Sequence, residues 1–298
     1  MKILITGALQ YSEEYISCIQ SLGHSVVWMQ NEKDALPIPY DEVEGVICNG
    51  LFMHHPIEKF INLKYIQLTS AGLDRVPLKY IKAKGITIHN ARGVYSIPMA
   101  EFALSSVLSI YKQSKHFALA QAQHCWSKHR GLRELYGKNV CIVGCGSVGE
   151  ECAKRFSAMG CRIFGVDVFP REDENYNRIF ALDSLNEVLT YADVLILTLP
   201  LTEKSRHIIG NEQLNLLPND CIIVNISRGA IIDTNALAHI LAEKDITAVL
   251  DVFEEEPLNE NSLLWDMDNV YITPHNSFVG DGNARRLYDL ILNNLEKG

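Results

Sequence analysis

Short apolar runs alternate with segments of helical periodicity along nearly the whole chain. The first five runs, each bounded by turn residues, fall at 2–6, 25–29, 45–49, 65–69 and 86–90. Helical patterns are expected between them at 11–22, 56–61 and 77–84, with Gly85 as the C-cap of the last. Strands that alternate with helices are typical of a parallel sheet covered by helices, so this region predicts a small doubly wound α/β domain.

A long helical pattern then runs from about residue 97 to residue 125. Its apolar positions recur near the helical period, at Met99, Phe102, Ala103, Val107 and Ile110. Such a helix bridges two domains, contacts a second subunit or belongs to a single core, and the pattern leaves these alternatives open.

Six further apolar runs follow, at 140–143, 162–166, 194–199, 221–226, 247–252 and 270–273, with helices expected at 147–159, 185–191, 211–216 and 234–243. Six parallel strands joined by right-handed crossovers make a complete dinucleotide-binding sheet. A last helix, 284–296, is expected to return to the first domain. The sequence therefore predicts a smaller flavodoxin-like domain, 1–92 plus 276–298, and a Rossmann domain, 93–275.

The most informative motif lies where the run 140–143 ends. Gly144, Gly146 and Gly149 follow this strand and precede a helix that is expected to begin near Ser147. In a dinucleotide-binding unit, the first glycine makes the tight turn, the second lets the backbone approach a pyrophosphate, and the third lets the helix pack on the strand. The N-terminus of the helix then directs unpaired N–H groups at the phosphates.

Asp167 ends the next strand, roughly 20 residues after the glycines, where such units place an acidic residue. A carboxylate there accepts hydrogen bonds from a ribose diol and repels a 2′-phosphate, so NAD is the expected cofactor. Arg171 is the nearby residue that would accommodate a phosphate, so NADP is less favoured but stays open.

Composition excludes several other classes of protein. The 298 residues carry a net charge of −9, which disfavours a nucleic-acid surface, and no apolar run approaches the ~20 residues of a membrane helix. The N-terminus is patterned as a short strand rather than as a signal peptide. None of the eight cysteines forms a CxxC pair, so reduced thiols in a cytoplasmic protein are expected. His124 and His129 flank Trp126 without ligand spacing, and no metal site is assigned.

Candidate catalytic residues follow three successive strands of the second domain. Arg228 comes after the run 221–226, an acidic triplet that ends at Glu256 comes after 247–252, and His275 comes after 270–273. The carboxyl ends of parallel strands meet at one edge of a sheet, where ligands bind. A guanidinium suits a substrate carboxylate, an imidazole exchanges a proton, and a carboxylate orients that imidazole. Hydride transfer at C2 of a 2-hydroxy acid is therefore expected, although each residue taken alone also fits a surface or packing role.

The chain resembles the D-isomer-specific 2-hydroxyacid dehydrogenase family over essentially its whole length. The matching segments are 135–149, 199–202, 225–229, 250–257 and 273–275, which read LYGKNVCIVGCGSVG, LPLT, NISRG, LDVFEEEP and TPH. The resemblance implies that Arg228 is the catalytic, substrate-binding arginine, that Glu256 is the partner of the histidine, and that His275 is the acid/base.

The resemblance also implies the remaining site residues, with Asp251 at the nicotinamide amide. The residues implied to bind the cofactor are Gly144, Gly146, Ser147, Val148, Gly149, Asp167, Leu199, Pro200, Ile226, Ser227, Arg228, Asp251, His275 and Phe278. Those implied to bind the substrate are Ser70, Ala71, Gly72, Arg228 and His275. A homodimer built on the cofactor domains and an active site in the cleft between the two domains are implied as well.

Departures from the family pattern bear on the substrate. Asn276-Ser277-Phe278 stand where family members often have two glycines, so the wall near the nicotinamide is expected to differ. Glu256 argues against formate dehydrogenases, which usually place glutamine there. Leu68 stands near a position where many phosphoglycerate dehydrogenases carry arginine.

The expected activity is NADH-dependent reduction of glyoxylate, hydroxypyruvate or a similar small 2-keto acid. A phosphoglycerate-dehydrogenase-like substrate and an NAD-responsive, non-enzymatic binding module are the alternatives, because both can keep the same three residues. The sequence leaves open which acid is used, whether it is phosphorylated, how strictly NAD is preferred and how far the domains close.

Overall fold

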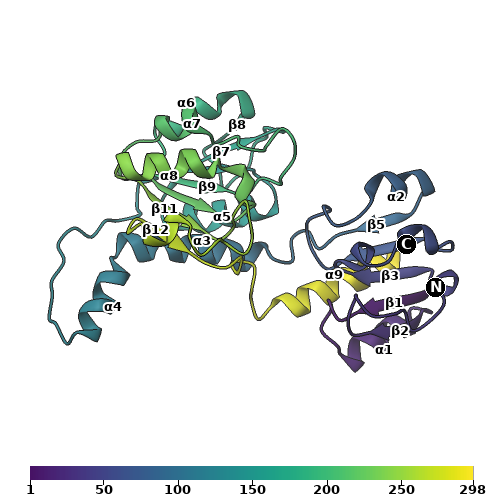
Figure 1. Cartoon of the computed structure of the whole chain (residues 1–298). Helices are drawn as coiled ribbons and strands as arrows, with labels where there is room; N and C mark the ends of the chain where they lie inside the picture. Colours follow the sequence, from purple (N-terminus) through teal and green to yellow (C-terminus); the bar gives the residue numbers. More distant parts are fainter. Residues whose placement is uncertain (298) are drawn as a thin grey trace. The chain divides into compact units, whose positions relative to one another are not determined.

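The computed structural model describes residues 1–297, which divide into two compact units (Figure 1). The first unit joins residues 1–95 to the C-terminal segment that starts at Gly280, and the second consists of Ser96–Val279. Each unit is built on one parallel sheet with helices packed on it, which confirms the predicted class of two doubly wound α/β domains. None of the helices in the described range is long and apolar enough to span a lipid bilayer.

The first unit has the flavodoxin-like strand order β2-β1-β3-β4-β5. Its strands are β1 (Lys2–Thr6), β2 (Ser25–Met29), β3 (Gly45–Cys48), β4 (Tyr65–Leu68) and β5 (Thr87–His89). Its α-helices are α1 (Glu13–Ser21), α2 (Leu78–Lys84) and α9 (Asn283–Lys297), and 3-10 turns form at Tyr40–Glu42, Leu51–Met53 and Ile57–Lys59. The helix expected at 56–61 is therefore only a 3-10 turn, because the backbone leaves the helical region at Phe60, whose ψ is 68°. Gly85 ends α2 as the predicted C-cap, in the left-handed conformation that glycine often adopts there.

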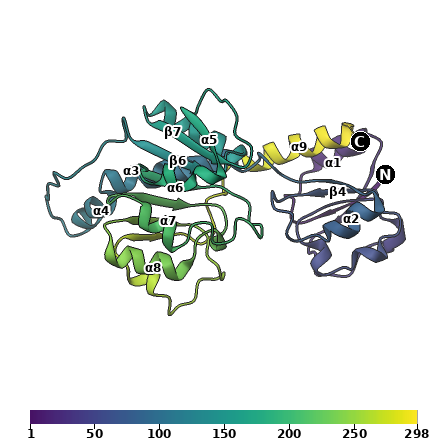
Figure 2. The ribbon, with the colours of Figure 1, turned by 90° about the horizontal axis from the view of Figure 1, so that it is seen from above.

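The C-terminal helix α9 belongs to the core of the first unit. Its side chains Leu287, Tyr288 and Ile291 are buried with Ile3 and Ile5 of β1. The helix contacts α1, and Figure 2 shows the two side by side. Residues three and four positions apart share one face of a helix, so this spacing explains why α9 buries one side.

The second unit has the strand order β12-β11-β10-β9-β6-β7-β8. Its strands are β6 (Asn139–Val143), β7 (Arg162–Asp167), β8 (Arg178–Ala181), β9 (Val194–Leu197), β10 (Ile222–Asn225), β11 (Thr247–Leu250) and β12 (Val270–Ile272). Its α-helices are α3 (Ser96–Tyr111), α4 (Ser114–Ala122), α5 (Ser147–Ala158), α6 (Leu185–Leu189), α7 (Asn211–Leu216) and α8 (Thr234–Glu243). Short 3-10 helices lie at Leu182–Ser184, Gly229–Ile231 and Leu263–Asp266.

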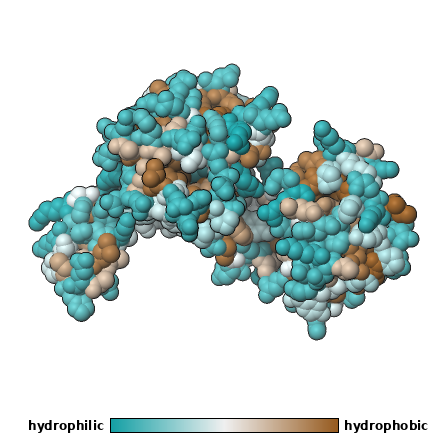
Figure 3. Space-filling view, viewed as in Figure 1, coloured by the Kyte–Doolittle hydropathy of each residue, from teal (hydrophilic) through white to brown (hydrophobic). Residues whose placement is uncertain are grey.

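Two sequence predictions for this unit need correction. The sheet has a strand beyond the six expected, β8, which lies at its edge and buries only its two central residues. The single helix expected at 97–125 is divided into α3 and α4, because Gln113 between them has the left-handed φ of 54°. The segment that follows the break exposes apolar side chains, and Figure 3 shows apolar patches there, at lower left. The exposed apolar residues of α4 and the loop after it are Phe117, Leu119, Trp126 and Leu132.

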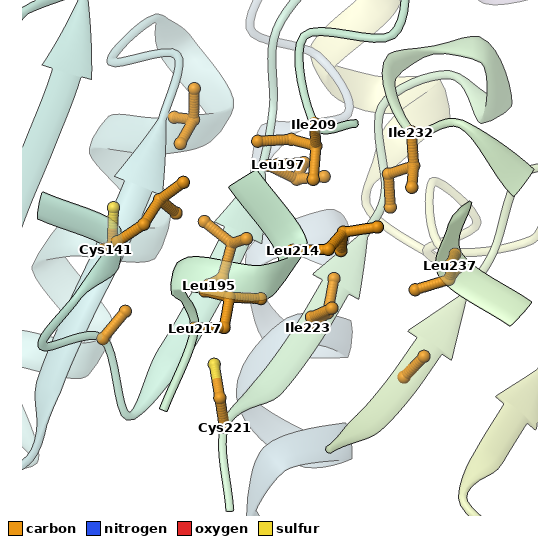
Figure 4. Close-up of a cluster of buried hydrophobic side chains, with 14 of the residues drawn as sticks. Cys141, Leu195, Leu197, Ile209, Leu214, Leu217, Cys221, Ile223, Ile232 and Leu237 are labelled. Atoms are coloured by element: carbon orange, nitrogen blue, oxygen red, sulfur yellow. The ribbon is translucent and has the colours of Figure 1, made fainter. Parts of the chain in front are cut away.

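The sheet of the second unit is buried on both faces. On the face shown in Figure 4, Leu195 and Ile223 of the strands pack with Leu214 of α7 and Leu237 of α8. On the other face, the alternate strand residues pack with α3 and α5. Successive strand side chains point to opposite faces, and helices cover both faces, so nearly every strand side chain is buried. This burial explains the nearly continuous apolar runs in the sequence.

The register of the strands places their carboxyl ends at one edge of the sheet. Leu197 pairs with Val143 of β6 and with Asn225 of β10, and Leu250 pairs with Asn225 and with Ile272 of β12. Residues that directly follow these strands therefore emerge together. The candidate residues of the second unit come from these positions.

Candidate active site

The turn after β6 is shaped by two glycines that a side chain would disrupt. Gly144 has the left-handed φ of 100°, and a Cβ placed on it would lie 2.8 Å from the backbone nitrogen of Leu199. A Cβ on Gly149 would lie 2.2 Å from the carbonyl oxygen of Gly144. The helix α5 begins at Ser147, directly after Gly146. The turn therefore brings a helix N-terminus to the strand ends, an arrangement that fits the diphosphate of a dinucleotide.

Asp167 lies beside this turn at the end of β7. One oxygen of its carboxylate, Oδ2, accepts a hydrogen bond from the backbone N–H of Cys145 at 2.7 Å, and Oδ1 accepts one from the N–H of Phe169 at 2.9 Å. The carboxylate is thus held next to the glycines, where the sequence placed it. The thiol of Cys145 itself is buried, and burial raises its pKa to about 12.

His275 and Glu256 form a hydrogen-bonded pair beyond the strands β12 and β11. The imidazole Nδ1 lies 2.8 Å from Oε2 of Glu256, whose other oxygen accepts the backbone N–H of Phe253 at 3.0 Å. The two side chains are 39% and 37% exposed, so the pair is accessible to a ligand. Because Glu256 engages Nδ1, the nitrogen that can exchange a proton is Nε2. The ring of Phe278 meets the imidazole edge-on, with 6.0 Å between ring centroids.

Asp251 supports the segment that carries His275. Its side chain is completely buried and accepts hydrogen bonds from the Thr273 hydroxyl at 2.6 Å, the Asn276 N–H at 2.7 Å and the Ser277 N–H at 3.0 Å. His275 has a left-handed φ of 50°, which costs about 1–3 kcal/mol in a non-glycine residue. The buried carboxylate stabilises this conformation. Its implied contact with a nicotinamide amide stays a prediction.

Arg228 follows β10 in a loop that is held from both sides. Its Nη1 donates to the carbonyl of Ser227 at 2.7 Å, and the side-chain amide of Asn225 donates to the Arg228 carbonyl at 3.1 Å. A Cβ on Gly229 would lie 1.8 Å from the carbonyl carbon of Phe253, so the loop that carries Glu256 packs directly on this glycine. The backbone segments of Arg228 and Glu256 are therefore neighbours.

The other predicted cofactor residues of this unit lie at the same strand ends. Leu199 and Pro200 come just after β9, and the backbone of Leu199 packs on Gly144. Ile226 and Ser227, both buried, come directly after β10. Val148 lies in the first turn of α5. The second unit thus gathers the predicted cofactor residues around one sheet edge, and their binding roles stay predictions.

The predicted substrate loop belongs to the first unit, where it follows β4. The carbonyl of Ala71 accepts the side-chain amide of Asn90 at 2.7 Å, and the carbonyl of Ser70 accepts the N–H of Ala91 at 2.9 Å. The Ser70 hydroxyl donates to the carbonyl of Gly72 at 3.2 Å. The carbonyls of the loop are thus engaged by neighbouring residues.

One supporting residue was not found from the sequence. Glu254 accepts hydrogen bonds from His207 at 2.8 Å and from both the N–H and the hydroxyl of Thr234, at 3.2 and 2.8 Å. Burial by itself raises the pKa of Glu254, but these hydrogen bonds outweigh it and lower the pKa overall. The acidic triplet was the only signal, and it does not distinguish Glu254 from its neighbours. Among residues 1–297, no group of three or more His, Cys, Asp and Glu side chains is arranged to hold a metal ion.

Comparison with known proteins gives a consistent set of relatives. The family model described as D-isomer specific 2-hydroxyacid dehydrogenase, NAD binding domain, matches residues 104–277. A hydroxypyruvate reductase of Thermotoga maritima is 35% identical over 251 residues, which cover 82% of this chain and 81% of that protein. A D-3-phosphoglycerate dehydrogenase of Methanocaldococcus jannaschii is also 35% identical, over 92% of this chain and 53% of that protein, so the chain spans about half the length of that relative.

A solved structure agrees with these relatives. The glyoxylate reductase of Paecilomyes thermophila superposes with a TM-score of 0.84 and 25% identity, covering 99% of this chain and 94% of that one. The family resemblance recognised in the sequence motifs is thereby confirmed, and so is NAD as the cofactor of the second unit.

Proposed function

Because the chain belongs to the D-isomer specific 2-hydroxyacid dehydrogenase family and is an NAD-dependent enzyme of that family, we propose that it reduces a small 2-keto acid of the glyoxylate and hydroxypyruvate class. The product is the corresponding D-2-hydroxy acid. The observation that carries the proposal is the 2.8 Å contact of His275 with Glu256 at the strand ends of the unit that matches the NAD-binding model.

Each polar group has a distinct task in this reaction. His275 gives a proton from Nε2 to the substrate carbonyl oxygen, while Glu256 orients the ring and stabilises its protonated form. Arg228 binds the substrate carboxylate, for which its planar guanidinium is suited. Bound NADH supplies the hydride, and the close-packed turn at Gly144 and Gly149 brings a helix N-terminus to the strand ends for its phosphates.

The proposal extends to the first unit and to the choice of acid. Ser70, Ala71 and Gly72 serve as the backbone N–H cradle for the substrate carboxylate. A hydroxypyruvate reductase and a D-3-phosphoglycerate dehydrogenase are equally identical to this chain, at 35%, so identity alone does not choose between an unphosphorylated and a phosphorylated acid, and we propose the unphosphorylated one. Leu68 in β4 supports the same choice, because an arginine near this position would suit a phosphate.

We also propose that the enzyme works as a homodimer in the cytoplasm. The exposed apolar side chains of α4 and the loop after it, including Trp126 at 93% exposure, are the kind of surface that a second copy covers. All eight cysteines are free, which fits a reducing compartment. Light scattering during size-exclusion chromatography would measure the mass, and a monomer at micromolar concentration would contradict the dimer.

A panel of 2-keto acids, with and without a phosphate group, tests the proposed activity directly. The purified protein is mixed with each acid and either NADH or NADPH, and coenzyme oxidation is followed by loss of absorbance. Glyoxylate and hydroxypyruvate should be reduced with NADH, and phosphorylated acids should react more slowly. If NADH binds but no acid is turned over, the protein is an NAD-responsive binding module instead.

A further inference from the structure

The backbone of one residue in the glycine turn, Cys145, is held by two side chains of opposite charge. The N–H of Cys145, between Gly144 and Gly146, donates to Oδ2 of Asp167 at 2.7 Å. The carbonyl of the same residue accepts a hydrogen bond from Nη2 of Arg171, also at 2.7 Å. Both side chains come from the end of β7 or the loop after it. Two residues outside the glycine motif, Asp167 and Arg171, therefore hold the turn in place.

Arg171 is itself held by a carboxylate on α5. The same Nη2 lies 2.6 Å from Oε1 of Glu150, in the first turn of that helix, and 4.0 Å from Oδ2 of Asp173. Glu150 stabilises the positive end of the helix, but its negative charge also lies where the phosphates of a dinucleotide would approach. Arg171 offsets that charge, because it forms an ion pair with Glu150.

We propose that Arg171, held by Glu150, is a positioning residue for the glycine turn and sets the preference between NADH and NADPH. The inference rests on the proposed function, since it concerns the coenzyme site of that enzyme. While Glu150 and the Cys145 carbonyl bind the Arg171 guanidinium, it holds the turn in place and does not bind a 2′-phosphate. Asp167, which accepts the N–H of the same residue, repels that phosphate. Coenzyme preference therefore depends on Glu150 as well as on the acid at the end of β7.

The charge of Glu150 is the first feature to test. The variant Glu150→Gln keeps the size of the side chain and removes its charge. Dissociation constants of NADH and NADPH are measured by coenzyme fluorescence without substrate. We expect the affinity for NADPH to rise about threefold relative to that for NADH, the size of a helix-terminus charge effect. The matched control is Glu151→Gln on the same helix, whose carboxylate pairs with Arg155 instead, and it should leave the ratio unchanged.

The guanidinium is tested by removing it and by a double-mutant cycle. Arg171→Ala should weaken NADH binding about fivefold, because the turn loses a hydrogen bond and Glu150 is left without its counter-ion. Adding Glu150→Gln to this variant should restore part of the affinity, which a purely structural role of Arg171 would not predict. Arg171→Lys keeps the charge, so it should lose less affinity for NADH than Arg171→Ala does. Thermal melting verifies that each variant is folded.

The outcomes separate this inference from the proposed function. If NADH fails to bind the parent protein, both are wrong. If NADH binds and is oxidised by a keto acid, but Glu150→Gln shifts the coenzyme ratio no more than Glu151→Gln does, only the inference is overturned. An unchanged NADH affinity in Arg171→Ala would overturn it as well.

Discussion

Two regions at the same edge of the second sheet are built in different ways. The glycine turn after β6 is shaped by its backbone, because a Cβ on Gly144 or Gly149 would come within 2.8 Å of main-chain atoms. The His275–Glu256 pair beyond β12 and β11 consists of side chains that are each more than a third exposed. The first region therefore depends on the absence of side chains, and the second depends on the presence of particular ones.

Their supports, by contrast, are alike in kind, because charged side chains hold the backbone of both regions. Asp167 and Arg171 hold the backbone of Cys145 in the turn. The exposed pair depends on carboxylates behind it, because Asp251 holds the segment of His275 and Glu254 holds the loop of Glu256. Substitutions should thus affect coenzyme binding in one region and turnover in the other.

The largest effect is expected on kcat, when the proposed acid/base side chain of His275 is removed. His275→Ala should lower kcat by about 10²–10⁴-fold, the usual contribution of a general acid, and leave the dissociation constant of NADH nearly unchanged. Steady-state kinetics and coenzyme fluorescence measure the two quantities. His239→Ala is the matched control, because His239 is a surface residue on α8 that faces Glu243. A His275→Ala enzyme that reduced keto acids at the parent rate would remove His275 from the mechanism.

Gly149→Ala should have the opposite effect to His275→Ala, because it should weaken coenzyme binding. The added methyl group would lie 2.2 Å from the Gly144 carbonyl oxygen, so the turn must open. We expect NADH to bind about tenfold more weakly, and the free energy of unfolding to fall by about 1–3 kcal/mol, as in other overpacked sites. Gly210→Ala is the control, because Gly210 has an ordinary φ of −103° and its nearest neighbour atom would be 3.5 Å from the new Cβ. Equal losses in both variants would contradict a special role for the turn.

A smaller effect is expected at the support of Glu256. Glu254→Gln weakens the hydrogen bonds from Thr234 and His207, so stability should fall by about 1 kcal/mol and kcat by a few-fold. The pKa of Glu254 is lower in the folded protein than in the unfolded chain. Its contribution is therefore present above the unfolded pKa, near 4.5, and is lost as pH falls through the lower folded pKa.

Melting temperatures measured from pH 7 down to pH 3 check the Glu254 prediction. The difference between parent and Glu254→Gln should shrink at the acid end. Glu255→Gln, at the exposed neighbouring position, serves as the control and should match the parent throughout. A difference that grew on acidification would show that the sign is wrong.

The smallest effect concerns the closed interior of the glycine turn. The pKa of Cys145 is raised to about 12 by burial, so its thiol stays protonated and unreactive at pH 8. Cys18, on the exposed side of α1, should react with iodoacetamide in the native protein, whereas Cys145 should react only after denaturation. Peptide mass spectrometry of the labelled protein distinguishes the two sites, and rapid native labelling of Cys145 would mean that the turn opens in solution.

Most of the fold could be predicted from periodicity because each element carries its own local signal. The helices Asn211–Leu216 and Thr234–Glu243 were predicted with their observed bounds. The edge strand β8 was missed because only two of its residues are buried, which is too short a run to recognise. The break at Gln113 was missed because the polar residues around it are compatible with a helix.

The sequence by itself determined how most strands and helices follow one another along the chain, where the glycine turn lies, and which types of side chain follow each strand. These depend on neighbours within a few residues, so a linear pattern contains them. Only the tertiary structure decided that Glu256 meets His275, that Asp251 holds the histidine segment, and that Arg171 joins Glu150 to the Cys145 carbonyl. Such pairs join residues far apart in the chain, and their distances are set by which strands lie side by side in the sheet.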